Sequence, residues 1–213
     1  MFPAREGEPM PLNLDDLTVS QLDALKEVGN IGAGHGATAL SQLLGKKIFI
    51  TVPEATILNL SDVPKLVGDP NTLVAGLTLS VLGDATGKIL MLFSRDHALH
   101  LADLLLKQPV GTSQVLTEMG HSALKEAGNI LSGAYVSALN EFLGMLLLIS
   151  VPTLVFDMAG AILATITQGM EDDTKVLCIE TRFVDAQEVL GGYFILVPDA
   201  ISLRAIFQAI KVK

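Results

Sequence analysis

One stretch of the sequence occurs twice, and this internal duplication limits the possible folds more than any other feature. When the chain is shifted by 99 positions, residues 17–53 align with residues 116–152, and 17 of the 37 aligned positions are identical. Chance would give only a few identities. A period this long does not suit a solenoid and predicts a fold in which a pseudo-two-fold axis relates two copies of one unit.

Each copy begins with apolar residues at helical spacing, over residues 22–44 in the first copy and 124–143 in the second. Gly45 and Gly144 follow and are expected to end these helices. Apolar strands come next, with the sequences IFITV and LLLISV.

A hairpin and a further helix complete each predicted unit. The hairpins are formed by GLTLSVLG with KILMLF and by VLCIETRFV with YFILV. The closing helices are expected after Ser94 through Leu106 and after Asp199 through Ile210. The order helix, strand, hairpin, helix predicts an α+β fold with a largely antiparallel sheet covered by helices.

The predicted domain organisation is a short lead-in followed by one domain. Residues 1–14 contain three prolines and no apolar signal core, so we expect a flexible segment. Residues 15–213 are expected to form a single domain of two repeats, about 15–112 and 113–213. The longest apolar run, residues 142–156, is shorter than the roughly 20 residues of a membrane-spanning helix, so no membrane insertion is expected.

The composition excludes some partners and favours a compartment. The formal net charge of -9 would repel phosphate backbones, which argues against nucleic acid and suits a protein partner with a basic patch better. The single cysteine, Cys178, lies in an apolar run and is expected to be a buried thiol. Because it permits no intramolecular disulfide, a reducing cytoplasm is predicted.

A polar strip is part of the duplicated stretch. Successive helical residues advance by about 100°, so positions 23, 27 and 30 fall within about 60° of one another. A solvated helix face would explain either strip alone, but its repetition favours recognition or chemistry. The repeated positions, together with a distant proline, are Asp23, Glu27, Asn30 and Pro53 in the first copy and Ser122, Glu126, Asn129 and Pro152 in the second.

The residue types in the strip suit positioning rather than acid or base catalysis. Asparagine is a poor general base, but its amide both donates and accepts hydrogen bonds and can orient a water molecule for in-line attack. A glutamate one turn away can accept a salt bridge from a partner's lysine. The pair therefore suits a protein that supplies residues to another protein's active site.

Two other motifs in the sequence suggest a nucleotide site and a metal site, but each has a simpler explanation. The string GNIGAGHGAT resembles a phosphate-binding loop, but it matches no nucleotide-binding spacing and the second copy, GNILSGAYVS, keeps only two glycines, so close helix packing is favoured. His97 and His100 lie at i, i+3 and could bind a metal, but no third ligand accompanies them, so surface histidines are favoured.

The segments LDALKEVGNIGAGHGATALSQLLGKKIFITVP and HSALKEAGNILSGAYVSALNEFLGMLLLISVP resemble the paired active-site segments of the CheC-type chemotaxis phosphatases, a family that includes CheC, CheX and FliY. The resemblance covers nearly the whole chain beyond its first 14 or so residues, and both copies keep the family's Asp/Ser, Glu, Asn and Pro signature. CheX typically has one such motif and FliY has an added flagellar-switch domain, so the CheC branch is the most similar.

The resemblance implies a cytoplasmic phosphatase that hydrolyses the aspartyl phosphate of the response regulator CheY. Asn30 and Asn129 would orient the attacking water, and Glu27 and Glu126 would contact the regulator's active-site lysine. The supporting positions would be Asp23, Pro53, Ser122 and Pro152. No cofactor is expected in this chain, because the Mg²⁺ and the phosphoaspartate belong to the partner.

The family also binds the receptor deamidase CheD, which is therefore a second expected partner. With both motifs in one chain, the protein could act as a monomer. The alternative is an adaptor that docks CheD or CheY and has weak catalysis. Whether both strips work as sites stays open at the level of the sequence.

Overall fold

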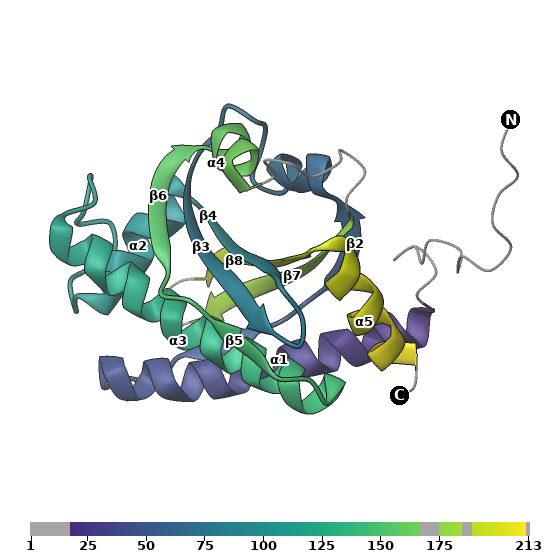
Figure 1. Ribbon diagram of the computed structural model, residues 1–213. Coiled ribbons are helices and arrows are strands. Elements are labelled where there is room, and N and C mark those ends of the chain that lie inside the picture. The colour runs from purple at the N-terminus through teal and green to yellow at the C-terminus, as the bar shows by residue number, and fades with distance from the viewer. Residues whose placement is uncertain (1–17, 167–174, 185–188, 212–213) are drawn as a thin grey trace, which may run out of the picture.

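The computed structural model describes residues 18–166, 175–184 and 189–211, which form an eight-stranded sheet with helices on both faces (Figure 1). The predicted lead-in, residues 1–14, lies outside the described residues. The first copy contains α1 (Val19–Leu44), β1 (Phe49–Thr51), β2 (Ala55–Asn59), the 3-10 helix η2 (Leu60–Leu66), β3 (Leu73–Gly83), β4 (Gly87–Ser94) and α2 (Arg95–Leu105). The second contains α3 (Glu118–Leu143), β5 (Leu147–Ile149), β6 (Thr153–Met158), α4 (Ala159–Ile166), β7 (Lys175–Val184), β8 (Val189–Pro198) and α5 (Ala200–Lys211).

The predicted α+β class and the duplication are confirmed. Each unit contains more secondary-structure elements than its sequence pattern indicated. A second strand and a short helix lie between the first strand and the hairpin of each copy. Pro53 and Pro152 interrupt pairing, as expected of residues without an N–H, but the chain returns to the sheet within a few residues. The expected division of the domain near residue 112 stays a prediction.

The two long helices begin and end alike. The side chains of Thr18 and Thr117 cap their first turns by accepting hydrogen bonds from backbone N–H groups. Gly45 and Gly144 adopt left-handed conformations, with φ of 68° and 67°, and end the helices as predicted. Both helices have 26 residues, so the strips lie at equivalent positions on equivalent supports.

Strands from the two copies interlock in the sheet. Its order is β1-β7-β8-β4-β3-β5, with β2 also paired to β7 and β6 to β3. All these pairs are antiparallel. The strands that follow α1 thus pair with the hairpin of the second copy, and those that follow α3 pair with the hairpin of the first.

Hydrophobic cores lie on both faces of the sheet. Along β4, Ile89 and Met91 face α1 and α3, while Leu90 and Leu92 face η2 and α4, as the alternation of a strand requires. Figure 1 shows α1 and α3 running beneath the sheet and α4 on the opposite side. Cys178 is buried in the second core, as predicted, and burial raises the pKa of its thiol to about 12.

The glycine-rich string is helical and lies where α1 meets α3. A Cβ on Gly32 would lie 2.9 Å from the Cα of Tyr135, and one on Gly36 would lie 2.9 Å from a methyl group of Leu131. These glycines allow close helix contact, which confirms the packing interpretation. A Cβ on Gly34 would meet nothing within 4 Å, because that residue faces open space.

We expect Gly32→Ala to lower the free energy of unfolding by about 1–3 kcal/mol, because the new methyl group meets a neighbouring backbone. Gly34→Ala is the matched control and should raise that free energy by about 0.5–1 kcal/mol through helix propensity alone. Chemical denaturation of both variants measures the difference. Equal effects would show that the helix contact does not depend on Gly32.

Asp103, near the end of α2, holds the loop that leads to α3. Its side chain is fully buried and accepts hydrogen bonds from the backbone N–H groups of Thr112 and Ser113 at 2.9 and 3.2 Å. Burial has the largest single effect on the pKa of Asp103 and raises it, because it opposes ionisation of the carboxyl group. The hydrogen bonds from Ser113, Thr112 and Gly111 together outweigh it and hold the pKa of Asp103 below its ordinary value of 3.8.

Asp103→Asn should therefore destabilise the protein near neutral pH by about 1–3 kcal/mol, whereas Asp96→Asn, an exposed change on the same helix, should have little effect. The pKa of Asp103 is lower in the folded chain than in the unfolded chain. Its ionised side chain therefore contributes fully to folding stability when the pH is above the ordinary carboxyl pKa, and this contribution is lost as the pH falls through the lowered pKa of the folded chain. Denaturation at several pH values should show the gap between wild type and Asp103→Asn closing in acid. A gap independent of pH would contradict this account.

Candidate functional site

The polar strips lie on the outer faces of the two long helices. Asp23 and Glu27 are exposed and Asn30 is half-buried on α1. The opposite face of α1, with Leu25 and Val28, packs into the core. On α3 the residues Ser122, Glu126 and Asn129 are all exposed. Helical spacing alone thus located the strips correctly.

The glycine that precedes each asparagine sets the distance between helix and sheet. A Cβ on Gly29 would lie 3.4 Å from Ile179 of β7, and a Cβ on Gly128 would lie 2.5 Å from Leu77 of β3. Each helix therefore rests on a strand of the other copy. Both strips depend on the interlocked sheet, and neither is supported by its own copy alone.

The amide of Asn30 is held by the backbone of the first copy. Its Oδ1 accepts a hydrogen bond from the N–H of Val52 at 3.2 Å. The following Pro53 restricts Val52 to an extended backbone and keeps β1 from continuing. This contact gives the spacing between Asn30 and Pro53 a physical reason. The proline ends sheet pairing next to Val52, and the N–H of Val52 then bonds the Asn30 amide.

The second copy lacks this arrangement. Among the described residues the side chain of Asn129 makes no hydrogen bond, and Val151, the counterpart of Val52, is 79% exposed where Val52 is 3%. Ser150 instead exchanges hydrogen bonds with Ser80 of β3, through its N–H and its hydroxyl group. The chain after β5 thus stays with the sheet and does not turn toward α3.

The carboxylates of the strips are also available to a partner. Glu27 and Glu126 are exposed and form no ion pair within the described part of the chain. An exposed carboxylate one turn from an exposed amide can engage a lysine and a water molecule of a second protein. The arrangement provides donors and acceptors but no nucleophile next to a base.

His97 and His100 are half-buried on α2, so the expectation of surface histidines is wrong for this pair. Nδ1 of His97 lies 3.0 Å from the carbonyl oxygen of Gly191, which links α2 to β8. Within residues 18–166, 175–184 and 189–211, no group of three or more His, Cys, Asp or Glu side chains is placed to hold a metal ion. The described helices also include none long and apolar enough to cross a membrane.

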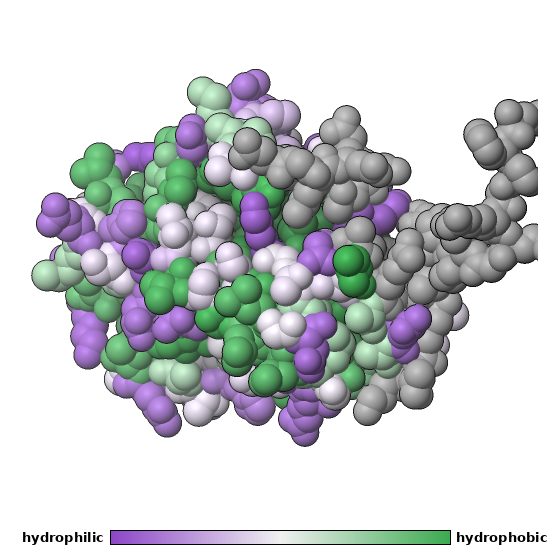
Figure 2. Space-filling model, in the orientation of Figure 1, coloured by the Kyte–Doolittle hydropathy of each residue, from purple (hydrophilic) through white to green (hydrophobic). Residues whose placement is uncertain are grey.

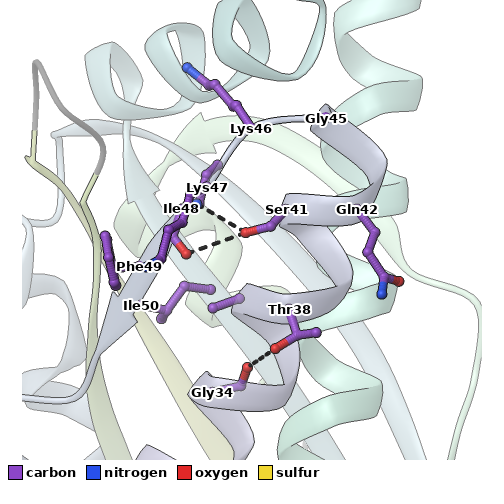
Figure 3. A pocket seen from close by; sticks show the side chains of 11 residues that line it. Gly34, Thr38, Ser41, Gln42, Gly45, Lys46, Lys47, Ile48, Phe49 and Ile50 are labelled. Carbon is purple, nitrogen blue, oxygen red and sulfur yellow. Dashed lines mark hydrogen bonds between the residues drawn. The ribbon is translucent and has the colours of Figure 1, made fainter.

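Sequence reasoning missed a pocket beside the first strip, between the end of α1 and β1 (Figure 3). Its volume is about 630 Å³. The available signal was the difference between the copies after the shared glycine, GKKIF against GMLLL. The pocket is lined by Gly34, Ala37, Thr38, Ser41, Gln42, Gly45, Lys46, Lys47, Ile48, Phe49 and Ile50.

The fold and the two strips define a pseudo-symmetric α+β protein that presents repeated Glu–Asn pairs on exposed helices. The sequence model of the CheC-like family matches residues 21–57 and 119–156, once in each copy. The CheY-P phosphatase CheC of Bacillus subtilis (strain 168) is 35% identical over 198 residues, which cover 89% of this chain and 93% of that protein. The chain belongs to the CheC-like family.

Two further similarities agree with this assignment. The flagellar motor switch phosphatase FliY of Bacillus subtilis (strain 168) is 30% identical over 146 residues, covering 68% of this chain and 38% of that protein. The crystal structure of Thermotoga maritima FliY superposes with a TM-score of 0.77 at 22% identity, over 93% of this chain and 99% of that one. At this identity the structural likeness supports the fold.

We expect the hydrogen bond from Val52 to make the two asparagines unequal in their structural roles. Asn30→Ala should lower the free energy of unfolding by about 1 kcal/mol and speed hydrogen exchange at the Val52 amide. Asn129→Ala is the matched change and should alter stability by less than about 0.5 kcal/mol, as for other exposed sites. Denaturation and NMR-detected exchange measure both effects, and equal behaviour would contradict the asymmetry.

Proposed function

We propose that this protein hydrolyses the aspartyl phosphate of the response regulator CheY. The observation that carries the proposal is the Glu–Asn strip that occurs once on each of two equivalent helices, with both glutamates exposed, in a member of the CheC-like family. The relative named a CheY-P phosphatase shares this family and most of its length with the chain. Asn30, Glu27, Asn129 and Glu126 are the proposed functional residues, and Asp23, Ser122, Pro53 and Pro152 support them.

The Asn30 amide is suited to hold a water molecule in place. One lone pair of Oδ1 is engaged by Val52, so the Nδ2 group and the second lone pair of Oδ1 can bind the water. Fixing that water in line with the scissile bond lowers the entropic part of the barrier. Glu27 would hold the register by pairing with a lysine of the regulator.

The bonds change on the partner in this mechanism. The water oxygen forms a bond to phosphorus, the bond from phosphorus to the aspartyl oxygen breaks, and the products are inorganic phosphate and the free aspartate carboxylate. The water's proton leaves to the phosphate and solvent. We propose that the Mg²⁺ needed for this step is held by the regulator and not by this chain.

Three further expectations belong to the proposal. The protein would work in the cytoplasm, where its partner lies. It would act as a monomer, since one chain carries both strips on a single domain. CheD would be a second partner.

The test is the decay of phosphorylated CheY. Wild type should accelerate phosphate loss, and the variant carrying Asn30→Ala and Asn129→Ala should return the decay to the regulator's own rate. His35→Ala, an exposed change on α1 outside the strip, is the control and should keep full activity. Circular dichroism should show that all variants are folded.

A folded double variant with undiminished activity would exclude the amides from the mechanism. If wild type itself leaves the decay unchanged at saturating concentration but binds CheD tightly, the adaptor alternative holds instead.

A further inference from the structure

The pocket beside the first strip continues the surface that carries Asn30. Along α1, Gly34, Thr38 and Ser41 fall within about 80° of Asn30 around the helix axis. Gly34 lies about 6 Å beyond Asn30 along the axis, and the helix ends about 22 Å beyond it. On the other wall β1 leads back from Phe49 to Val52, which bonds Asn30. Strip and pocket thus form one continuous surface.

A regulator that docks at Asn30 would therefore meet this pocket. A standard interface covers about 800 Å² on each partner, which corresponds to a radius of roughly 16 Å. The near part of the pocket lies well inside that radius, and the lysines after α1 lie near its edge. Charges in such a rim position affect the rate of association more than the chemistry.

The pocket carries positive charge in an acidic protein. Lys47 is exposed, and its Nζ lies 4.6 Å from the centre of the Phe49 ring, whereas the side chain of Lys46 extends away from the other labelled residues (Figure 3). Lys107 also approaches, with its Nζ 3.9 Å from where a Cβ on Gly45 would lie. The formal net charge of the chain is -9, so this cluster is a local exception to its surroundings.

Stabilisation of the C-terminal end of α1 does not explain why lysines follow it. A cation after the last turn stabilises the helix macrodipole. However, α3 ends at Gly144 in the same conformation, and Met145 and Leu146 follow there in place of Lys46 and Lys47.

The corresponding surface of the second copy is largely apolar. Leu146, Leu148 and Val151 are 57%, 53% and 79% exposed. Figure 2 shows apolar side chains gathered over the region where β5 runs. Glu141 replaces Gln42, and the carboxylate of Asp84 accepts a hydrogen bond from the N–H of Leu146 at 2.8 Å. Lys88 lies on the far side of Val151, where its Nζ donates a hydrogen bond to the carbonyl oxygen of Ile166 at 2.8 Å.

We propose that the pocket lined by Lys47 and Phe49 docks an acidic surface of the phosphorylated regulator, so that the first strip binds its partner electrostatically and the second binds through apolar contact. The inference rests on the proposed function. The phosphoaspartate and the carboxylates that hold Mg²⁺ beside it would meet Asn30 and give this face of the regulator a negative charge, which attracts the lysines at the edge of the interface. Because the rest of the chain is acidic, the cluster also orients the encounter.

The first experiment compares enzymes with one working strip. The first-strip enzyme carries Glu126→Lys and Asn129→Ala, and the second-strip enzyme carries Glu27→Lys and Asn30→Ala. Each glutamate change repels the regulator's lysine, so the altered strip loses docking as well as water positioning. As NaCl rises from about 50 to 300 mM, kcat/KM of the first-strip enzyme should fall roughly three- to tenfold with kcat unchanged. The second-strip enzyme should change less than about twofold.

The second experiment removes the pocket's charge. In the first-strip enzyme, Lys47→Glu should raise KM roughly fivefold or more, leave kcat unchanged and abolish the salt dependence. Lys65→Glu is the matched control, because it makes the same charge change in η2 on the opposite face of the sheet, and it should leave both parameters as they were.

Equal salt dependence of the two enzymes, or equal effects of Lys47→Glu and Lys65→Glu, would overturn the inference while leaving the proposed function intact. Binding separates the two claims further. The regulator carrying beryllofluoride in place of the phosphoryl group should bind the Lys47→Glu enzyme more weakly than the Lys65→Glu enzyme. If that difference appears but no variant hydrolyses phosphate, the docking surface stands and the proposed function fails.

Discussion

The pairing of each copy's strands with the other copy's hairpin is the constraint on which the rest of the structure depends. β7 pairs with β1 and β2, and β3 pairs with β5 and β6. The long helices follow the same exchange, because Gly29 rests on Ile179 and Gly128 on Leu77. A strip is therefore positioned only when both copies are folded together, which couples the stability of one site to that of the other.

Much of the fold followed from local signals in the sequence. The two glycines that end the long helices, the hairpins and the outward position of the strips all came from helical or alternating periodicity. The exchange of strands did not, because residues such as Ala55 and Ile179 meet through long-range pairing that no local pattern encodes. β2 was missed for a related reason: it is five residues long, follows a proline and is half-buried throughout.

The site shows the same division between local pattern and tertiary context. Spacing placed Glu27 and Asn30 on one face, but it could not show that the amide is held by the N–H of Val52. The sequence left open whether the two strips are equivalent, and the structure shows that their surroundings differ, because Val52 is buried and Val151 is exposed. The copies diverge most in the residues after the helix, and these alter the surroundings of each strip while the strip itself is kept.

The central claim is that both asparagine amides meet the phosphoryl group of a bound regulator. The most direct measurement is the NMR spectrum of the side-chain amide groups, assigned by their disappearance in Asn30→Ala and Asn129→Ala, during titration with CheY that carries beryllofluoride. The account predicts that the resonances of both amides shift on binding. Binding of the regulator without a shift of either resonance would contradict it.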